Sequence, residues 1–247
     1  DFGLYLTPAK KDLVYSRLIK RLRQLGLNDF RAYCQLIEDE HHAEERVQLL
    51  SALTTNVTHF FREAHHFQTL REKVLPSLIA RTRAQGRLRL WSAGCSAGQE
   101  PYSLAITLLE TFPEAERFDA KILATDIDPA ILDRAQAGIY STDEAETMPE
   151  DLRKRYFEPA QGGRMAIAAR VRSLVRFGGL NLIDPWPMTG PFDAIFCRNV
   201  AIYFDKETQA RLWHRFAGLL APGGHLFIGH SERVSGPASD LFQADGV

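Results

Sequence analysis

Strand-like and helix-like segments alternate along this sequence from about residue 87 onward. Short apolar runs end at small or polar residues, and each of the first three is followed by a segment with helical spacing. This pattern predicts an α/β domain with a parallel, doubly wound sheet. The strand candidates are 87–91, 121–125, 192–197 and 225–229, and the helix candidates are 102–111, 129–137 and 206–220.

The residues before about position 80 show a helical pattern only. Apolar side chains recur at helical spacing in four sets, and Asn28 is the predicted N-cap of the second helix. We expect a small helical bundle over residues 1–80 and the α/β domain over 81–247, joined by the polar stretch 80–86. The sets are Val14, Leu18, Leu22 and Leu25; Phe30, Tyr33 and Ile37; Val47, Leu50 and Leu53; and Phe67, Leu70, Val74 and Leu78.

One segment of the α/β region has a period of two. Between residues 164 and 177, apolar side chains alternate with arginines. This spacing predicts an antiparallel ribbon, apolar on one side and basic on the other, inserted in the α/β domain over residues 158–177. Its arginines are Arg164, Arg170, Arg172 and Arg176.

Composition excludes several classes of protein. A formal net charge of −1 gives no sign of nucleic-acid or membrane binding, and no apolar run reaches the ~18 residues of a membrane span. Cys34, Cys95 and Cys197 are far apart, so we expect neither disulfides nor a zinc site, but a reducing, cytoplasmic location. The His41-His42 and His65-His66 pairs lack further ligands at metal spacing, so no metal is expected.

Three peptides stand where strands are predicted to end, which is where open α/β sheets bind ligands. The loop 92–98 consists of small residues, including Gly94, that let the backbone approach a ligand. Asp126 follows the next strand and can accept hydrogen bonds from ribose hydroxyls. Polar and aromatic residues follow a later strand at 198–204. The glycine spacing is not that of a dinucleotide site, so NAD is disfavoured.

These peptides belong to longer strings with a known counterpart. They read ALTTNVTHFFRE at 52–63, WSAGCSAGQEPYS at 91–103, ATDID at 124–128, FDAIFCRNV with IYFD at 192–205, and GHSE at 229–232. In these strings and their order, the sequence resembles the CheR family of chemotaxis-receptor glutamate methyltransferases. The resemblance implies a helical N-terminal domain, a class I methyltransferase domain and an inserted β subdomain.

The resemblance also implies a cofactor site for S-adenosylmethionine and its product S-adenosylhomocysteine. It assigns the ribose to Asp126 and the methionine ammonium to Glu100, and it puts Arg62 and Tyr203 near the transferred methyl group. Since Arg62 precedes the α/β region, the cofactor is expected between the two domains. The expected cofactor-binding residues are Asn56, Thr58, Arg62, Gly94, Glu100, Asp126, Asn181, Leu182, Arg198 and Asn199.

The implied reaction methylates a glutamate carboxylate, which is ionised at neutral pH because its pKa is about 4.3. It needs no general base, and the sequence offers no convincing His–carboxylate or Cys–His pair. The remaining work is to orient the reactants and exclude water.

The expected partners are the acidic methylation helices of a receptor, docked on a basic first helix with Lys10, Arg17, Lys20 and Arg21. A solvated face is the plainer interpretation of this charge. Tight capture of a receptor tail peptide is not expected. The loop 158–163 looks shorter than in the family members that capture such peptides, it lacks their Arg-Gly start, and its Pro159 removes a backbone donor. We expect a monomer.

Two other functions stay open from the sequence. The chain can be a class I methyltransferase for another acceptor, such as RNA or a small molecule. It can also be a binding module that senses S-adenosylmethionine without turnover. A product ester that is labile to alkali distinguishes the first alternative, and binding without turnover indicates the second.

Overall fold

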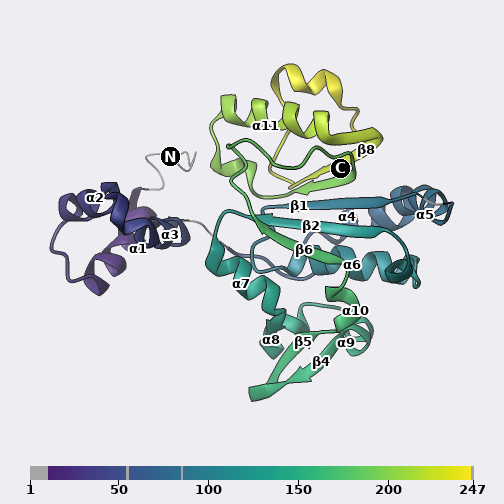
Figure 1. Ribbon diagram of the computed structural model, residues 1–247, viewed down its shortest axis with the longest axis horizontal. Coiled ribbons are helices and arrows are strands. Elements are labelled where there is room, and N and C mark those ends of the chain that lie inside the picture. The colour runs from purple at the N-terminus through teal and green to yellow at the C-terminus, as the bar shows by residue number, and fades with distance from the viewer. Residues whose placement is uncertain (1–10, 54–55, 85, 246–247) are drawn as a thin grey trace.

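A five-stranded parallel sheet forms the centre of the computed structural model, which describes residues 11–53, 56–84 and 86–245 (Figure 1). The strand order is β6-β2-β1-β7-β8, and every neighbouring pair is parallel. This confirms the predicted parallel α/β architecture. The strands are β1 (Leu88–Ala93), β2 (Ala120–Asp126), β6 (Val175–Gly179), β7 (Phe192–Cys197) and β8 (Leu220–Ile228).

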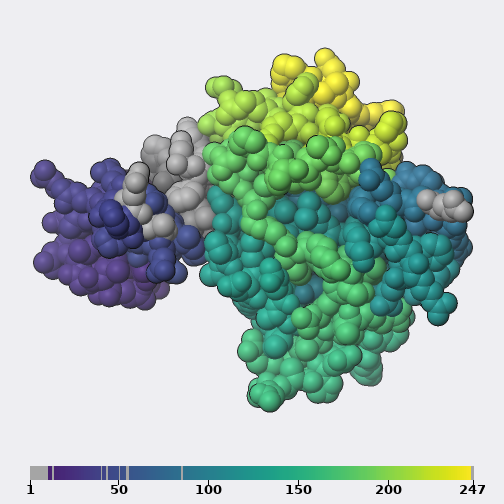
Figure 2. Space-filling model, in the orientation of Figure 1, coloured from purple at the N-terminus to yellow at the C-terminus, as the bar shows by residue number. Residues whose placement is uncertain are grey.

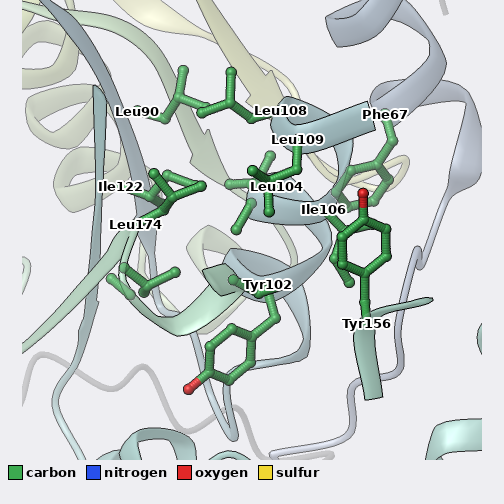
Figure 3. Close-up of a cluster of buried hydrophobic side chains, with 14 of the residues drawn as sticks. Phe67, Leu90, Tyr102, Leu104, Ile106, Leu108, Leu109, Ile122, Tyr156 and Leu174 are labelled. Carbon is green, nitrogen blue, oxygen red and sulfur yellow. The ribbon is translucent and has the colours of Figure 1, made fainter. Parts of the chain in front are cut away.

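Helices cover both faces of the sheet. Successive residues of a strand point to opposite faces, so neighbouring side chains join different cores. Leu90 of β1 joins a core with α6 (Gln99–Thr111), whereas its neighbour Trp91 joins a second core with α11 (Lys206–Leu219). Figure 1 shows α6 and α11 on opposite sides of the sheet, and Figure 3 shows Leu104, Ile106, Leu108 and Leu109 of α6 within the first core. The strands are therefore apolar on both faces, as buried parallel strands are.

The helices between residues 64 and 83 pack on this α/β core. They are α4 (Ala64–Thr69), a π-helical turn η3 (Leu70–Val74) and α5 (Leu75–Arg83). Phe67, Leu70 and Val74 lie in the same buried cluster as Leu90. The expectation that this fourth apolar set belongs to the N-terminal bundle was wrong, because helical spacing reveals an apolar face but not the surface that covers it.

The N-terminal helices form a lobe beside the rest of the molecule (Figure 2). They are α1 (Lys11–Gln24), α2 (Phe30–Glu38), the 3₁₀ turn η2 (Glu40–His42) and α3 (Ala43–Leu53). One buried cluster joins the three α-helices: both Glu45 oxygens accept from the Arg21 guanidinium, at 2.8 and 2.6 Å, and Oε1 also accepts from the Tyr33 hydroxyl. The N-cap of α2 is Asp29, which accepts from the Ala32 N–H at 2.8 Å, not the predicted Asn28.

A three-stranded antiparallel sheet lies apart from the main sheet, in the order β3-β5-β4. Its strands are β3 (Ile139–Tyr140), β4 (Phe157–Ala160) and β5 (Arg164–Ile167), and the turn η5 (Gln161–Gly163) joins β4 to β5. An inserted antiparallel sheet was predicted, but the ribbon over 164–177 was wrong in its second half. Residues Ala169–Arg172 form α10, and β6 pairs parallel with β2. A short helix exposes arginines as readily as a strand does, so the alternation was ambiguous.

Short elements complete the chain. They are η4 (Ala115–Arg117), α7 (Pro129–Ala137), α8 (Thr142–Glu146), α9 (Glu150–Tyr156), η6 (Ala201–Tyr203) and η7 (Gly236–Leu241). None of the helices in the described part of the chain combines the length and the apolarity that crossing a bilayer requires.

Candidate cofactor and methyl-transfer site

A cavity of about 240 Å³ opens at the carboxyl ends of the parallel strands. Four strands contribute to it, since Gly94 follows β1, Asp126 ends β2, Asn181 follows β6 and Arg198 follows β7. The segment that precedes α4 forms another wall. All predicted site residues line this cavity: Asn56, Thr58, Arg62, Gly94, Glu100, Asp126, Asn181, Leu182, Arg198, Asn199 and Tyr203.

The loop after β1 packs closely against the loop after β7, and only glycine fits at the point of closest approach. Gly94 has φ +84°, and a Cβ atom there would lie 2.4 Å from a methyl carbon of Val200. The N–H groups of Gly94 and Cys95 both donate to the Thr125 carbonyl, at 2.8 and 2.9 Å. The loop is thus held against the end of β2 with a surface that only glycine permits.

The Asp126 carboxylate lies at the bottom of this loop and is largely buried. Its Oδ2 accepts from the Ser96 N–H at 2.7 Å, and its Oδ1 accepts from the Asp128 N–H at 3.1 Å. Burial raises the pKa of Asp126, which these backbone donors partly offset. Each oxygen retains lone-pair capacity beyond its one backbone bond, so the carboxylate fits two ribose hydroxyls.

A buried ion-pair network forms the next part of the wall. The Arg198 guanidinium lies 3.0 Å from Glu100 and 3.2 Å from Glu63, and it also donates to the Arg62 carbonyl. Burial raises the pKa of Glu100 despite the Arg198 charge and a 2.7 Å bond from the Ser92 hydroxyl. Among the described residues, the buried Arg198 Nε has no hydrogen-bond partner, which leaves a donor for a polar ligand group.

The Arg62 side chain is held from two sides. Its guanidinium donates to the Val57 carbonyl at 2.9 Å and to Asn199 Oδ1 at 3.0 Å. Phe60 and Phe61 anchor the segment: Phe60 packs edge-on against Tyr140 and Phe157, with ring centroids 5.0 and 5.4 Å apart. Arg62 therefore reaches the cavity from a segment fixed in the core.

Backbone strain concentrates at the same place. Phe61, Glu63, Ser96 and Asn199 are the non-glycine residues with positive φ in the described part of the chain, at 55°, 55°, 49° and 60°. Two of them flank Arg62, and the others lie on the loops after β1 and β7. Such conformations cost about 1–3 kcal/mol each and persist where the surrounding structure enforces them, often at functional sites.

The other predicted residues occupy the rim and walls. Tyr203 lies in η6, and Thr58 precedes the Phe60 anchor. Asn181 Oδ1 accepts from the Ile183 N–H at 3.2 Å, and the buried Leu182 has a carbonyl that accepts from Arg215 at 2.7 Å.

The N-terminal helices contact the site indirectly. The Ser51 hydroxyl of α3 donates at 2.7 Å to Asp128, whose side chain also accepts from Ala130 N–H at the start of α7. No described residue of α1, α2 or α3 lines the cavity. The wall expected from an N-terminal domain comes from residues 56–67, which lead into helices of the α/β core.

Two acidic residues that support the cavity from outside it were missed by sequence reasoning. Glu63 accepts from Asn199 Nδ2 at 3.3 Å, and Glu232 accepts from the backbone of the loop after β7. Burial would raise the pKa of Glu63, but His230, Arg198 and Asn199 together hold it at about 2. Both residues lie in the strings noted above, HFFRE and GHSE, which were the available signal.

A cluster with metal-ligand geometry lies beside the cavity. Glu63, His65 and His66 bring donor atoms within 4.8 Å of one another. The Glu63 carboxylate, however, already faces the Arg198 guanidinium, which opposes a second cation. Burial, together with the charge of Arg198, lowers the pKa of His66 to about 4. The absence of a metal stays a prediction.

A parallel sheet with a glycine loop after β1 and a carboxylate at the end of β2 is typical of α/β domains that bind a nucleoside cofactor at the strand ends. The described geometry fits S-adenosylmethionine, through the Asp126 carboxylate, the Gly94 surface and the Arg198 donor.

Comparison with known families identifies the cofactor and the class. The family model for the CheR methyltransferase SAM-binding domain matches residues 56–246, and that for the CheR methyltransferase all-alpha domain matches residues 1–54. The chain belongs to the CheR family of methyltransferases, whose cofactor is S-adenosylmethionine.

Curated relatives carry corresponding names. A probable chemotaxis protein methyltransferase of Rhizobium etli is 52% identical over 100% of this chain and 93% of its own length. The chemotaxis protein methyltransferase of Escherichia coli is 44% identical over 94% of this chain and 80% of its own length. The chain is therefore a methyltransferase of the chemotaxis type.

Solved structures of other methyltransferases are more distant. PKMT2 from Rickettsia typhi in complex with AdoHcy has a TM-score of 0.37 and 18% identity, over 57% of this chain and 20% of that one. A likeness this weak carries no argument beyond the family assignment.

Proposed function

We propose that this chain transfers a methyl group from S-adenosylmethionine to glutamate side chains of chemoreceptors, which yields glutamate methyl esters and S-adenosylhomocysteine. The observation that carries the proposal is that Arg62 and Tyr203 line the same cavity as Asp126 and Glu100. The predicted cofactor groups and the predicted methyl-transfer groups thus line one cavity.

The bound cofactor supplies an electrophilic methyl group on a sulfonium. In the proposal, Asp126 accepts hydrogen bonds from the ribose hydroxyls and Glu100 accepts them from the methionine ammonium. The loop at Gly94 lets the backbone approach the cofactor closely. Arg198 favours the ionised form of Glu100, because its guanidinium lies 3.0 Å from that carboxylate and partly offsets the rise in pKa that burial causes.

The acceptor chemistry requires orientation and dryness. A glutamate with pKa about 4.3 enters as its carboxylate, so no residue has to remove a proton. Arg62 can orient that carboxylate by a charge-assisted hydrogen bond, while its bonds to Asn199 and Val57 limit how fully it pairs with the acceptor. Tyr203 lies at the cavity wall, where its hydroxyl can hydrogen-bond the acceptor.

The experiment that tests this proposal uses methyl-labelled cofactor and candidate receptor cytoplasmic fragments. We expect label in the receptor that alkali releases as methanol, because carboxylate esters hydrolyse readily whereas methylated amines do not. Label that resists alkali would indicate another acceptor, and cofactor binding without any transfer would indicate a binding module.

The second part of the proposal is a receptor-docking surface on α1, but its residues differ in part from those expected from the sequence. Arg21 is bonded to Glu45, and Arg17 donates to the Leu53 carbonyl at 3.2 Å, so both hold the helical lobe together. Lys10 lies outside the described residues. Lys20 and Arg23 are exposed on α1 and are the better candidates for contact with acidic receptor helices.

Reversal of Lys20 and Arg23 to Glu is expected to raise the KM for receptor about three- to tenfold near 50 mM salt, and to have less effect near 500 mM, since exposed charges are screened. The kcat should not change. The matched control is Arg71→Glu with Lys73→Glu, an equal charge change on the exposed surface of η3. A KM that responds equally to both pairs would show that only net charge matters.

Strand β4 is an edge of the small sheet, and it is a poor template for a tail peptide. The Tyr156 carbonyl accepts from Ala168 N–H, so these two residues form a hydrogen-bonded pair. Hydrogen-bonded and non-hydrogen-bonded pairs alternate along an antiparallel ladder, so the backbone groups of positions 157 and 159 point to the open edge. Pro159 has no N–H, and the Phe157 N–H already donates to the Arg153 carbonyl. Added strands depend on such donors.

We therefore expect receptor tail pentapeptides to bind with a Kd weaker than about 100 μM, since one open-edge donor is missing and one is engaged. Titration calorimetry with the wild-type chain measures this. A low-micromolar Kd that Pro159→Ala leaves unchanged and that substitutions in β5 abolish would contradict the prediction.

We also propose that the chain acts in the cytoplasm as a monomer. Sedimentation equilibrium, which measures the mass in solution, tests the oligomeric state.

A further inference from the structure

Glu232 is a buried carboxylate whose side chain accepts four backbone hydrogen bonds. Its Oε1 accepts from the N–H groups of Val200 and Ala201 at 3.0 and 2.7 Å. Its Oε2 accepts from Asn199 N–H at 2.8 Å and from Gly229 N–H at 2.7 Å. One side chain thus joins the loop that follows β7 to the end of β8.

The fit around this carboxylate is close. A Cβ atom on Gly229 would lie 2.9 Å from the Asn199 nitrogen and 2.9 Å from Glu232 Oε2. Gly229 is not among the residues with positive φ, so alanine is compatible with its backbone. The requirement for glycine here is therefore the approach of the two loops, and the carboxylate fills the remaining space.

Asn199 connects this anchor to the cavity. Its backbone has φ +60°, a conformation that the bond from its N–H to Glu232 helps to hold. In that conformation its Oδ1 accepts from Arg62 at 3.0 Å and its Nδ2 donates to Glu63. The Asn199 amide thus orients a guanidinium that lies 137 residues earlier in the sequence.

We propose that Glu232 is a positioning residue for methyl transfer: through the backbone of Asn199 it fixes the Asn199 amide, and through that amide it fixes Arg62. The inference rests on the proposed function for the role of Arg62. Glu232 does not line the cavity, so it acts through Asn199 and not on the reacting groups. The alternative is a purely structural staple, which would stabilise the fold without affecting Arg62.

Glu232→Gln is the first variant, because an amide retains one acceptor oxygen and places an NH₂ group against two backbone donors. Gly229→Ala is the second, because it keeps the carboxylate and separates the loops. The matched control is Glu144→Gln, a carboxylate that accepts the Ser141 N–H at 3.1 Å in a capping box away from the cavity. Thermal unfolding measures the loss of stability in each.

Methylation of receptor fragments gives the first readout. We expect Glu232→Gln and Gly229→Ala to lower kcat on the order of 10- to 100-fold, with the KM for receptor within about twofold, since displaced groups lose orientation. In an Arg62→Ala background, Glu232→Gln should lower kcat less than about threefold further, because the two residues act as a unit. Wild-type kcat in either single variant, or losses that multiply in the double variant, would overturn the proposal.

The second readout needs no receptor and so separates this inference from the proposed function. The Arg62 guanidinium resonances, assigned with an Arg62→Lys variant, report its bond to Asn199. They should shift in Glu232→Gln and Gly229→Ala but not in Glu144→Gln. If wild-type chain methylates no receptor and the resonances shift, the proposed function fails while the coupling stands. Unshifted resonances overturn the coupling whatever the activity.

Discussion

Asp126→Ala should weaken the binding of S-adenosylhomocysteine by about 100-fold, the loss expected when two hydrogen bonds to a charged, buried acceptor are removed. The carboxylate is buried at the end of β2 and has acceptor capacity beyond its bonds to Ser96 and Asp128. The substitution also leaves those two backbone donors without an acceptor, so the loop after β1 loses part of its support. Titration calorimetry with the product measures the change.

The control for this prediction is Asp133→Ala, which removes an exposed carboxylate from α7. It should leave the affinity for S-adenosylhomocysteine unchanged and have little effect on unfolding. An Asp126→Ala variant that is folded and binds with wild-type affinity would remove Asp126 from the cofactor site.

Arg62→Ala should lower kcat for receptor methylation by about 100-fold, and Tyr203→Phe by about tenfold, because both groups orient the acceptor carboxylate. The affinity for S-adenosylhomocysteine should change less than kcat does in both variants. Arg62→Lys should recover only part of the loss, since an ammonium cannot bond Val57, Asn199 and a carboxylate in the planar geometry of a guanidinium.

Steady-state kinetics at saturating cofactor provide the measurement, with Arg71→Ala and Tyr15→Phe as controls at exposed positions. The controls should keep wild-type kcat. If Arg62→Ala and Tyr203→Phe keep it too, the methyl-transfer site lies elsewhere.

The parallel sheet was predictable because each of its central strands is buried on both faces and reads as an apolar run. The predicted 192–197 agrees with β7, and 121–125 lies within β2. The strand ends then brought Gly94, Asp126 and Arg198 together, since parallel strands finish at one edge. This part of the site followed from topology alone.

The failures arose where a local pattern has more than one tertiary solution. The Phe67, Leu70 and Val74 stripe had the spacing of a bundle helix, yet its apolar face packs on the sheet core. The alternation in 164–177 continued across β5, α10 and β6 because arginine faces solvent from each of them. Spacing identifies which side chains are buried, but not against which element.

Charge was the least predictable feature. Arg17 and Arg21 looked like part of a docking face, but they bond a helix end and Glu45 within the lobe. Glu232 had no predicted role, although its four backbone bonds support the site from outside the cavity. Partners of buried charges come from distant segments, so the linear sequence does not reveal them.

The alternatives to receptor methylation have weaker support. A net charge of −1 is unlike that of proteins that bind RNA through a basic surface. A binding module without turnover does not need Arg62 at the cavity, between two residues whose backbones are strained by a positive φ.

Tandem mass spectrometry of a receptor fragment after reaction with this chain shows whether the acceptor is a glutamate carboxylate. We expect a methyl group on the side chain of particular glutamates, lost after mild alkali, and no modification by the Arg62→Ala variant in the same time. Replacement of those glutamates by alanine should remove the label. A methyl group on lysine, on a nucleic acid or on a small molecule, with the receptor glutamates unmodified, would mean that the acceptor is not a glutamate carboxylate.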